Sequence, residues 1–83
     1  MRLEPILVAA GEEGEGRLAL YDGRLVAVLV RLSALQESEA GWWFLEKGFG
    51  ALDTPNLMSF PDLSAAEAWL EARLAEAGPI DGR

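Results

Sequence analysis

Residues 17–32 contain two apolar runs that meet at Asp22 and Gly23. A two-residue Asp-Gly loop is typical of a type I′ turn, because both central positions of that turn need a positive φ. The segment therefore predicts a β-hairpin. Opposed residues of a hairpin share a sheet face, and this loop length predicts that Ala19 lies opposite Val26.

Both faces of the predicted hairpin are apolar. One face carries Leu18, Leu20, Leu25, Ala27 and Leu29, and the other carries Ala19, Tyr21, Val26, Val28, Val30 and Leu32. An antiparallel sheet with one solvated face alternates apolar and polar residues, whereas residues 25–30 are all apolar. One helix can cover only one face, so something else must cover the other. The pattern does not determine which face the helix takes.

The whole pattern predicts an α+β fold, with an antiparallel meander sheet of four or five strands and one C-terminal helix packed on one face. A first strand is expected over 3–10, ended by a glycine-rich turn. A later strand is expected over 41–47, followed by a turn with a buried Phe49. Residues 57–60 fit either a fifth strand or a loop, and the pattern leaves open whether the fourth strand is central or at an edge.

The helix is expected over 64–77. Ser64 and Glu67 have the spacing of a capping box, and Gly78 followed by Pro79 is a typical helix stop. Its apolar stripe consists of Ala66, Leu70, Leu74 and Ala77. The chain is expected to form a single domain over residues 1–83, with 79–83 as a flexible tail.

Composition argues against most catalytic chemistry. The chain has no cysteine and no histidine, which excludes thiol nucleophiles, Ser-His-Asp triads and the usual zinc sites. We therefore expect no cofactor and no metal site, and we expect that the chain is not an enzyme. Its 14 acidic and 7 basic side chains give a net charge of −7, which argues against nucleic-acid binding.

The sequence also bears on location. Residues 1–10 lack the layout of a signal peptide, and no segment approaches the roughly 20 apolar residues needed to cross a bilayer. We expect a cytoplasmic protein that does not bind membranes. Arginine far outnumbers lysine, and with abundant alanine, leucine and glycine this favours a bacterial source.

The uncovered sheet face predicts a place for a partner. Adjacent residues of a strand point to opposite faces, so one of Trp42 and Trp43 is expected beneath the helix and the other on the uncovered face. The interface candidates are Tyr21, Val26, Val28, Val30, Trp42 and Trp43. Two readings stay open: a homodimer formed through this face, and a module that binds another protein or a small apolar ligand there.

Charged residues offer weaker alternatives. Glu46, Asp53 and Asp62 are the carboxylates nearest the aromatic strand, and a carboxylate-only enzyme would need two of them in one pocket. Arg17 and Arg24 are predicted on one face, with Arg31 on the other; that first pair could hold a small anion, but solubility at the turn ends and pairing with nearby glutamates is the favoured interpretation. The acidic turn of Glu12, Glu13 and Glu15 lacks the pattern of a calcium loop.

Overall fold

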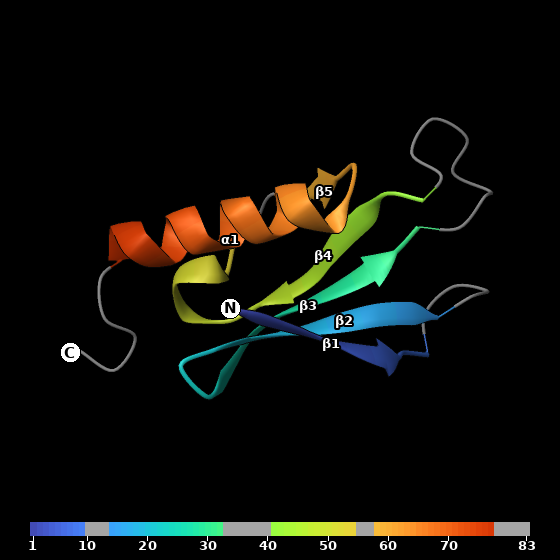
Figure 1. Cartoon of the computed structure of the whole chain (residues 1–83), viewed down its shortest axis with the longest axis horizontal. Helices are drawn as coiled ribbons and strands as arrows, with labels where there is room; N and C mark the ends of the chain where they lie inside the picture. Colours follow the sequence, from blue (N-terminus) through green and yellow to red (C-terminus); the bar gives the residue numbers. More distant parts are fainter. Residues whose placement is uncertain (10–13, 33–40, 55–57, 78–83) are drawn as a thin grey trace.

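The computed structural model describes residues 1–9, 14–32, 41–54 and 58–77. Within these residues, five strands form one antiparallel sheet in chain order, and one α-helix packs across it (Figure 1). The strands are β1 (Arg2–Leu7), β2 (Glu15–Tyr21), β3 (Arg24–Arg31), β4 (Trp43–Gly48) and β5 (Ser59–Phe60). A 3-10 turn, η2 (Gly50–Leu52), precedes β5, and the helix α1 (Leu63–Ala77) ends the described chain. The predicted α+β meander with a C-terminal helix is confirmed.

The turn between β2 and β3 has the predicted geometry. Asp22 has φ 57° and Gly23 has φ 78°, the two positive values that a type I′ turn requires. Tyr21 pairs with Arg24 directly across this turn. The Asp-Gly dipeptide therefore forms the hairpin turn at the predicted position.

The predicted register fails one step further along. Ala19 pairs with Ala27 and Leu20 pairs with Leu25, which leaves Val26 without an opposite residue. Val26 is thus the extra residue of a β-bulge, and a one-residue shift moves all later side chains of a strand to the other face. From residue 27 onward, β3 is inverted relative to the predicted faces. A second bulge at Glu46 of β4 shifts the pairing with β3 again.

The core lies between the sheet and α1. The helix contributes Ala66, Leu70 and Leu74, all buried, whereas the predicted stripe residue Ala77 is exposed. The helix-facing side of the sheet, called here the inner face, contributes Ala19, Val26, Ala27, Leu29, Trp43, Leu45 and Phe60. The Phe60 ring lies 5.6 Å from that of Trp69, and this contact joins β5 to the helix.

The segment after β4 contributes one side chain to the core between the sheet and α1. Leu52 of η2 is fully buried in the core. Its backbone passes so close to Gly48 that a Cβ there would lie 1.9 Å from the Leu52 carbonyl oxygen, so the site requires glycine. Phe49, predicted to be buried, is 42% exposed. Leu52 fills the core position instead.

The helix begins at Leu63, one residue before the predicted start at Ser64 with its proposed capping box. The Asp62 carboxylate accepts a hydrogen bond from the Ala65 N–H at 2.8 Å. Asp62 is therefore the N-cap. Its position in the sequence, ahead of a run of good helix formers, suits that role as well as the position of Ser64 does.

Several predictions fall elsewhere. The first strand ends at Leu7, before the predicted residue 10, and β5 is a strand of two residues. Part of the glycine-rich turn, the connection over 33–40 and the proposed tail lie outside the described residues. In the described part of the chain, no helix is long and apolar enough to cross a membrane.

Candidate interaction surface

The side of the sheet that faces away from α1, called here the outer face, is covered by no element among the described residues (Figure 1). Strand pairing determines which side chains lie on it. The apolar members are Ile6, Leu18, Leu20, Leu25, Val28, Val30, Phe44 and Phe49. They extend over four adjacent strands and reach past the end of β4.

The middle of the outer face is closely packed. Val30 is 6% exposed, yet it lies outside the core cluster formed by the described residues, so its neighbours on the outer face bury it. It pairs with Phe44 on one side and with Gly16 on the other. A Cβ placed on Gly16 would lie 3.5 Å from the Ile6 side chain, which shows that Ile6 lies beside this row.

The margins of the outer face are more open. Ile6 is 38% exposed, Leu25 is 40% exposed and Phe49 is 42% exposed. Scattered apolar residues on a surface are ordinary, but a contiguous apolar patch marks an interaction site. Because these three surround a half-buried apolar centre, the outer face is a contiguous patch.

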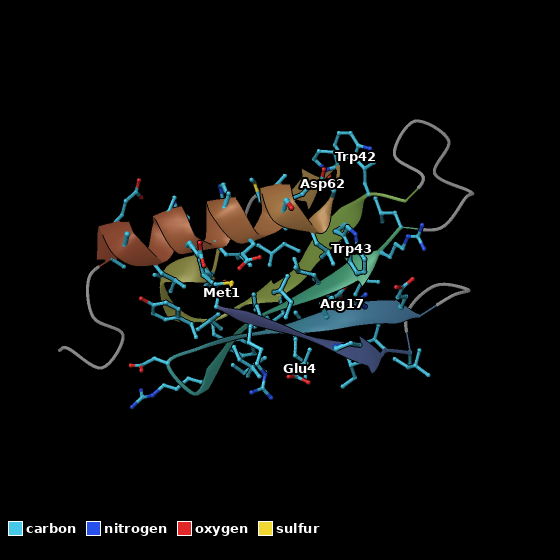
Figure 2. All side chains as sticks on the ribbon, in the orientation of Figure 1. Met1, Glu4, Arg17, Trp42, Trp43 and Asp62 are labelled. Carbon is cyan, nitrogen blue, oxygen red and sulfur yellow. The ribbon has the colours of Figure 1, made fainter. Side chains whose placement is uncertain are left out.

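Four charged side chains border the patch, among them the exposed bulge residue Glu46 of β4, which follows the inner-face Leu45. Arg2 and Glu4 of β1 lie on the outer face, and the Arg2 Nε donates a hydrogen bond to the Glu4 carboxylate. Figure 2 shows Glu4 on the side of the sheet that faces away from the helix. Lys47 of β4 lies on the same face, with its ammonium 5.5 Å from the centre of the Phe49 ring.

The sheet edges are poorly suited to pairing with another strand. The edge strand β1 contains Pro5, which has no N–H to donate. The opposite edge, β5, has only two residues. Next to it, the Leu45 N–H already donates to the Met58 carbonyl at 2.9 Å, and the Leu52 backbone lies against Gly48. A partner is therefore better received by the outer face than by an edge.

The six predicted interface residues lie in four places. Val28 and Val30 are on the outer face, while Val26 and Trp43 are buried in the core. Tyr21 is 38% exposed beside the turn and follows the inner-face alternation of β2. Trp42 is half-buried just before β4, and its indole lies apart from that of Trp43 (Figure 2).

Sequence reasoning placed part of the outer face wrongly. It put Leu18, Leu20 and Leu25 on the face opposite Val28 and Val30, whereas the structure brings all five together. Phe44 was not predicted, although alternation from a buried Trp43 indicates it. Alternation alone would put Phe49 on the same face as Trp43, and the bulge at Glu46 moves it to the outer face. The bulge at Val26 is the reason for the first error, because nothing in an unbroken apolar run shows where an extra residue stands.

The pairing keeps Arg17 and Arg24 on one face, as predicted, but Arg31 lies on that face too, because the Val26 bulge inverts the second half of β3. Glu15 accepts from both, at 3.4 Å from Arg17 and 3.1 Å from Arg31. The Arg17 guanidinium also lies 5.0 Å from the Trp43 ring centre. These contacts link β2, β3 and β4 on the inner face, so the arginines are engaged in holding the strands together.

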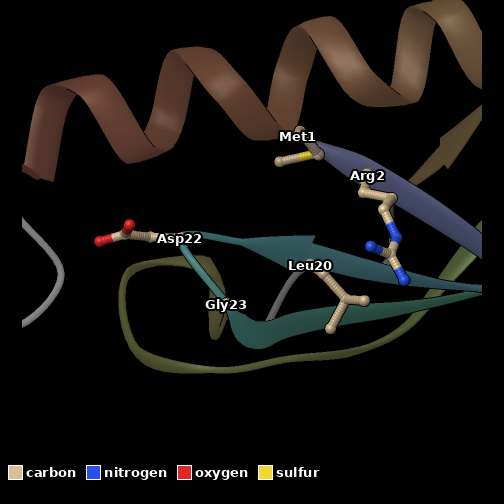
Figure 3. A pocket seen from close by; sticks show the side chains of 5 residues that line it. All are labelled: Met1, Arg2, Leu20, Asp22 and Gly23. Carbon is tan, nitrogen blue, oxygen red and sulfur yellow. The ribbon is translucent and has the colours of Figure 1, made fainter.

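The carboxylates named as acid or base candidates have separate surroundings. Asp62 caps the helix, while Glu46 and Asp53 are exposed on the β4 bulge and after η2. Among the described residues, no group of three or more potential metal ligands occurs. A depression of about 500 Å³ near the hairpin turn is lined by Met1, Arg2, Leu20, Asp22 and Gly23 (Figure 3). It contains one carboxylate, so it offers no acid/base pair.

Comparison of the chain with protein-family models, curated proteins and solved structures found no match.

Proposed function

We propose that the chain is a non-catalytic interaction domain that forms a homodimer through its outer face. The observation that carries the proposal is the contiguous apolar patch centred on Val28 and Val30, which no described element covers. Two such faces packed together would form a β-sandwich with an apolar centre. No partner of another kind is needed to bury the patch.

The size of the chain supports this reading. A specific interface buries about 600 to 1,000 Å² on each partner. Such an interface would take up between about an eighth and a fifth of the 5138 Å² accessible surface of one copy. Small domains bury a lower fraction of their surface than large ones, and association raises it.

The charge distribution also supports self-association. The described acidic residues of α1, among them Glu71 and Glu76, lie on the opposite side of the sheet from the outer face. On the outer face, Arg2 and Lys47 are matched by Glu4 and by the exposed bulge residue Glu46, which follows the inner-face Leu45. The described charges of the outer face therefore cancel, so two copies can meet there without net repulsion.

We also propose, from composition alone, that the protein is bacterial and cytoplasmic and that it binds neither nucleic acid nor membranes. A module that holds another protein or a small apolar ligand on the outer face is the alternative. The two readings differ in the state of the free chain, which is a dimer in the first and a monomer in the second.

The test is solution mass by light scattering over a concentration series. The unaltered chain should approach twice 9.0 kDa, and Val28→Asp should give a folded monomer, because it places a charge at the centre of the patch. Leu7→Asp introduces the same charge at an 82% exposed site away from the outer face and should remain dimeric.

Circular dichroism distinguishes loss of the dimer from loss of the fold. Leu70→Asp should unfold the chain, because the Leu70 side chain of α1 is fully buried in the core and an aspartate there would be an unpaired buried charge. A Val28→Asp protein that is folded and still dimeric would contradict the proposed surface. A monomeric unaltered chain would instead favour the alternative module.

A further inference from the structure

One transverse row of the outer face carries opposite charges at its two ends. Glu4 of β1 lies opposite Leu18 of β2, and Lys47 of β4 lies opposite Val28 of β3. Leu18 and Val28 lie opposite one another. The row therefore crosses four strands, with the Glu4 carboxylate at one end, two apolar side chains in the middle, and at the other end the Lys47 ammonium beside the exposed bulge residue Glu46.

We infer that the second copy packs on this face about a two-fold axis parallel to the strands, so that Glu4 of each copy pairs with Lys47 of the partner subunit. The inference rests on the proposed homodimer and specifies its arrangement. A two-fold axis in the plane between the sheets makes the interface isologous, with each contact occurring twice. The two arrangements that keep the strands of the sheets aligned differ in the direction of that axis.

The direction of the axis decides which charges meet. An axis parallel to the strands reverses the strand order across the interface and brings β1 of one copy over β4 of the other. Glu4 then faces Lys47 twice. An axis perpendicular to the strands that passes through this row leaves the order unchanged, so that each Glu4 faces the other Glu4 and each Lys47 faces the other Lys47. Like charges opposed across an interface disfavour that arrangement.

The dimensions of the row fit the first arrangement. Strands lie about 4.8 Å apart, so the row from β1 to β4 is about 14 Å wide, and packed sheets lie about 10 Å apart. Leu18 and Val28 would meet in the middle of this width, with the charged pairs at its two margins. Long side chains reach across such margins while their charged groups stay near water.

Both charged groups have the capacity for this contact. Glu4 already accepts from the Arg2 Nε, and a carboxylate has two oxygens that can accept several hydrogen bonds. The Glu4 side chain is 38% exposed. Lys47 is exposed, and its contact with the Phe49 ring keeps the ammonium on the outer face.

The test exchanges the two charges. Glu4→Lys and Lys47→Glu should each weaken the dimer by roughly 2- to 30-fold in Kd, because each replaces two exposed ion pairs with two repulsive contacts. The double variant Glu4→Lys/Lys47→Glu restores both pairs and the original net charge, and should recover most of the affinity. Sedimentation over a concentration series measures all four proteins.

Glu76→Lys is the control for a change in net charge. Glu76 is exposed on α1, on the far side of the sheet, and its substitution should leave the Kd within about 2-fold. Raising the salt concentration should weaken the unaltered dimer and strengthen the dimer of Glu4→Lys, because screening acts on attraction in one and on repulsion in the other.

Each result distinguishes this inference from the proposal beneath it. If Val28→Asp abolishes the dimer but neither charge exchange changes its Kd, the outer face is the interface and the axis is wrong. If both exchanges weaken the dimer and the double variant stays weak, the Glu4–Lys47 pairing is also wrong. If the unaltered chain is monomeric throughout, the homodimer itself is overturned.

Discussion

At the scale of single residues, the core depends on a side chain that stands outside the regular elements. Leu52 comes from the short η2 turn, has no apolar periodicity around it and is nevertheless fully buried. It occupies the core while its neighbour Phe49 remains at the surface. The larger apolar residue of a loop is therefore not always the one that is buried in the core.

Leu52→Ala should lower the free energy of unfolding by about 2 to 5 kcal/mol, because it removes a buried side chain and leaves a cavity. Urea unfolding followed by circular dichroism measures the change. Leu7→Ala makes the same replacement at a site that is 82% exposed, and should change stability by no more than about 0.5 kcal/mol. Equal effects of the two substitutions would contradict the burial of Leu52.

At the scale of elements, the start of α1 depends on one carboxylate. The Asp62 side chain satisfies the Ala65 N–H, a group that has no partner within the helix. The sequence also offers Ser64, three residues before Glu67, as a competing cap. The structure selects Asp62 because the helix begins at Leu63.

Asp62→Ala should destabilise the fold by about 1 kcal/mol through loss of this cap. Ser64→Ala should change stability by less than about 0.5 kcal/mol, because Ser64 is an exposed residue inside the helix. Thermal unfolding of the two variants compares them directly. A larger loss with Ser64→Ala would show that the capping box forms in solution.

The elements also show how far the sequence can lead. The Asp-Gly turn, the meander order and the apolar stripe of α1 are local patterns, and each was predictable. The bulges at Val26 and Glu46 depend on pairing between strands, and residues 25–30 offer equally apolar side chains in either register. For this reason the existence of an uncovered apolar face was predictable, whereas only Val28 and Val30 of its eight apolar members were predicted.

At the scale of the whole molecule, a homodimer makes thermal stability depend on concentration. A dimer that forms only from folded chains draws the equilibrium towards the folded state by mass action. The Tm of the unaltered chain should therefore rise with protein concentration. The Tm of Val28→Asp should be independent of it, and a concentration-dependent Tm in that variant would indicate association through some other surface.

The chain-order meander has a consequence for synthesis. Each strand of the described sheet can pair with the one made just before it, so the sheet can grow as the chain leaves the ribosome. The helix is made after all five strands, and until residues 63–77 have emerged the inner apolar face is bare as well. A nascent chain paused at β5 therefore exposes both faces at once and is the form most in need of a chaperone.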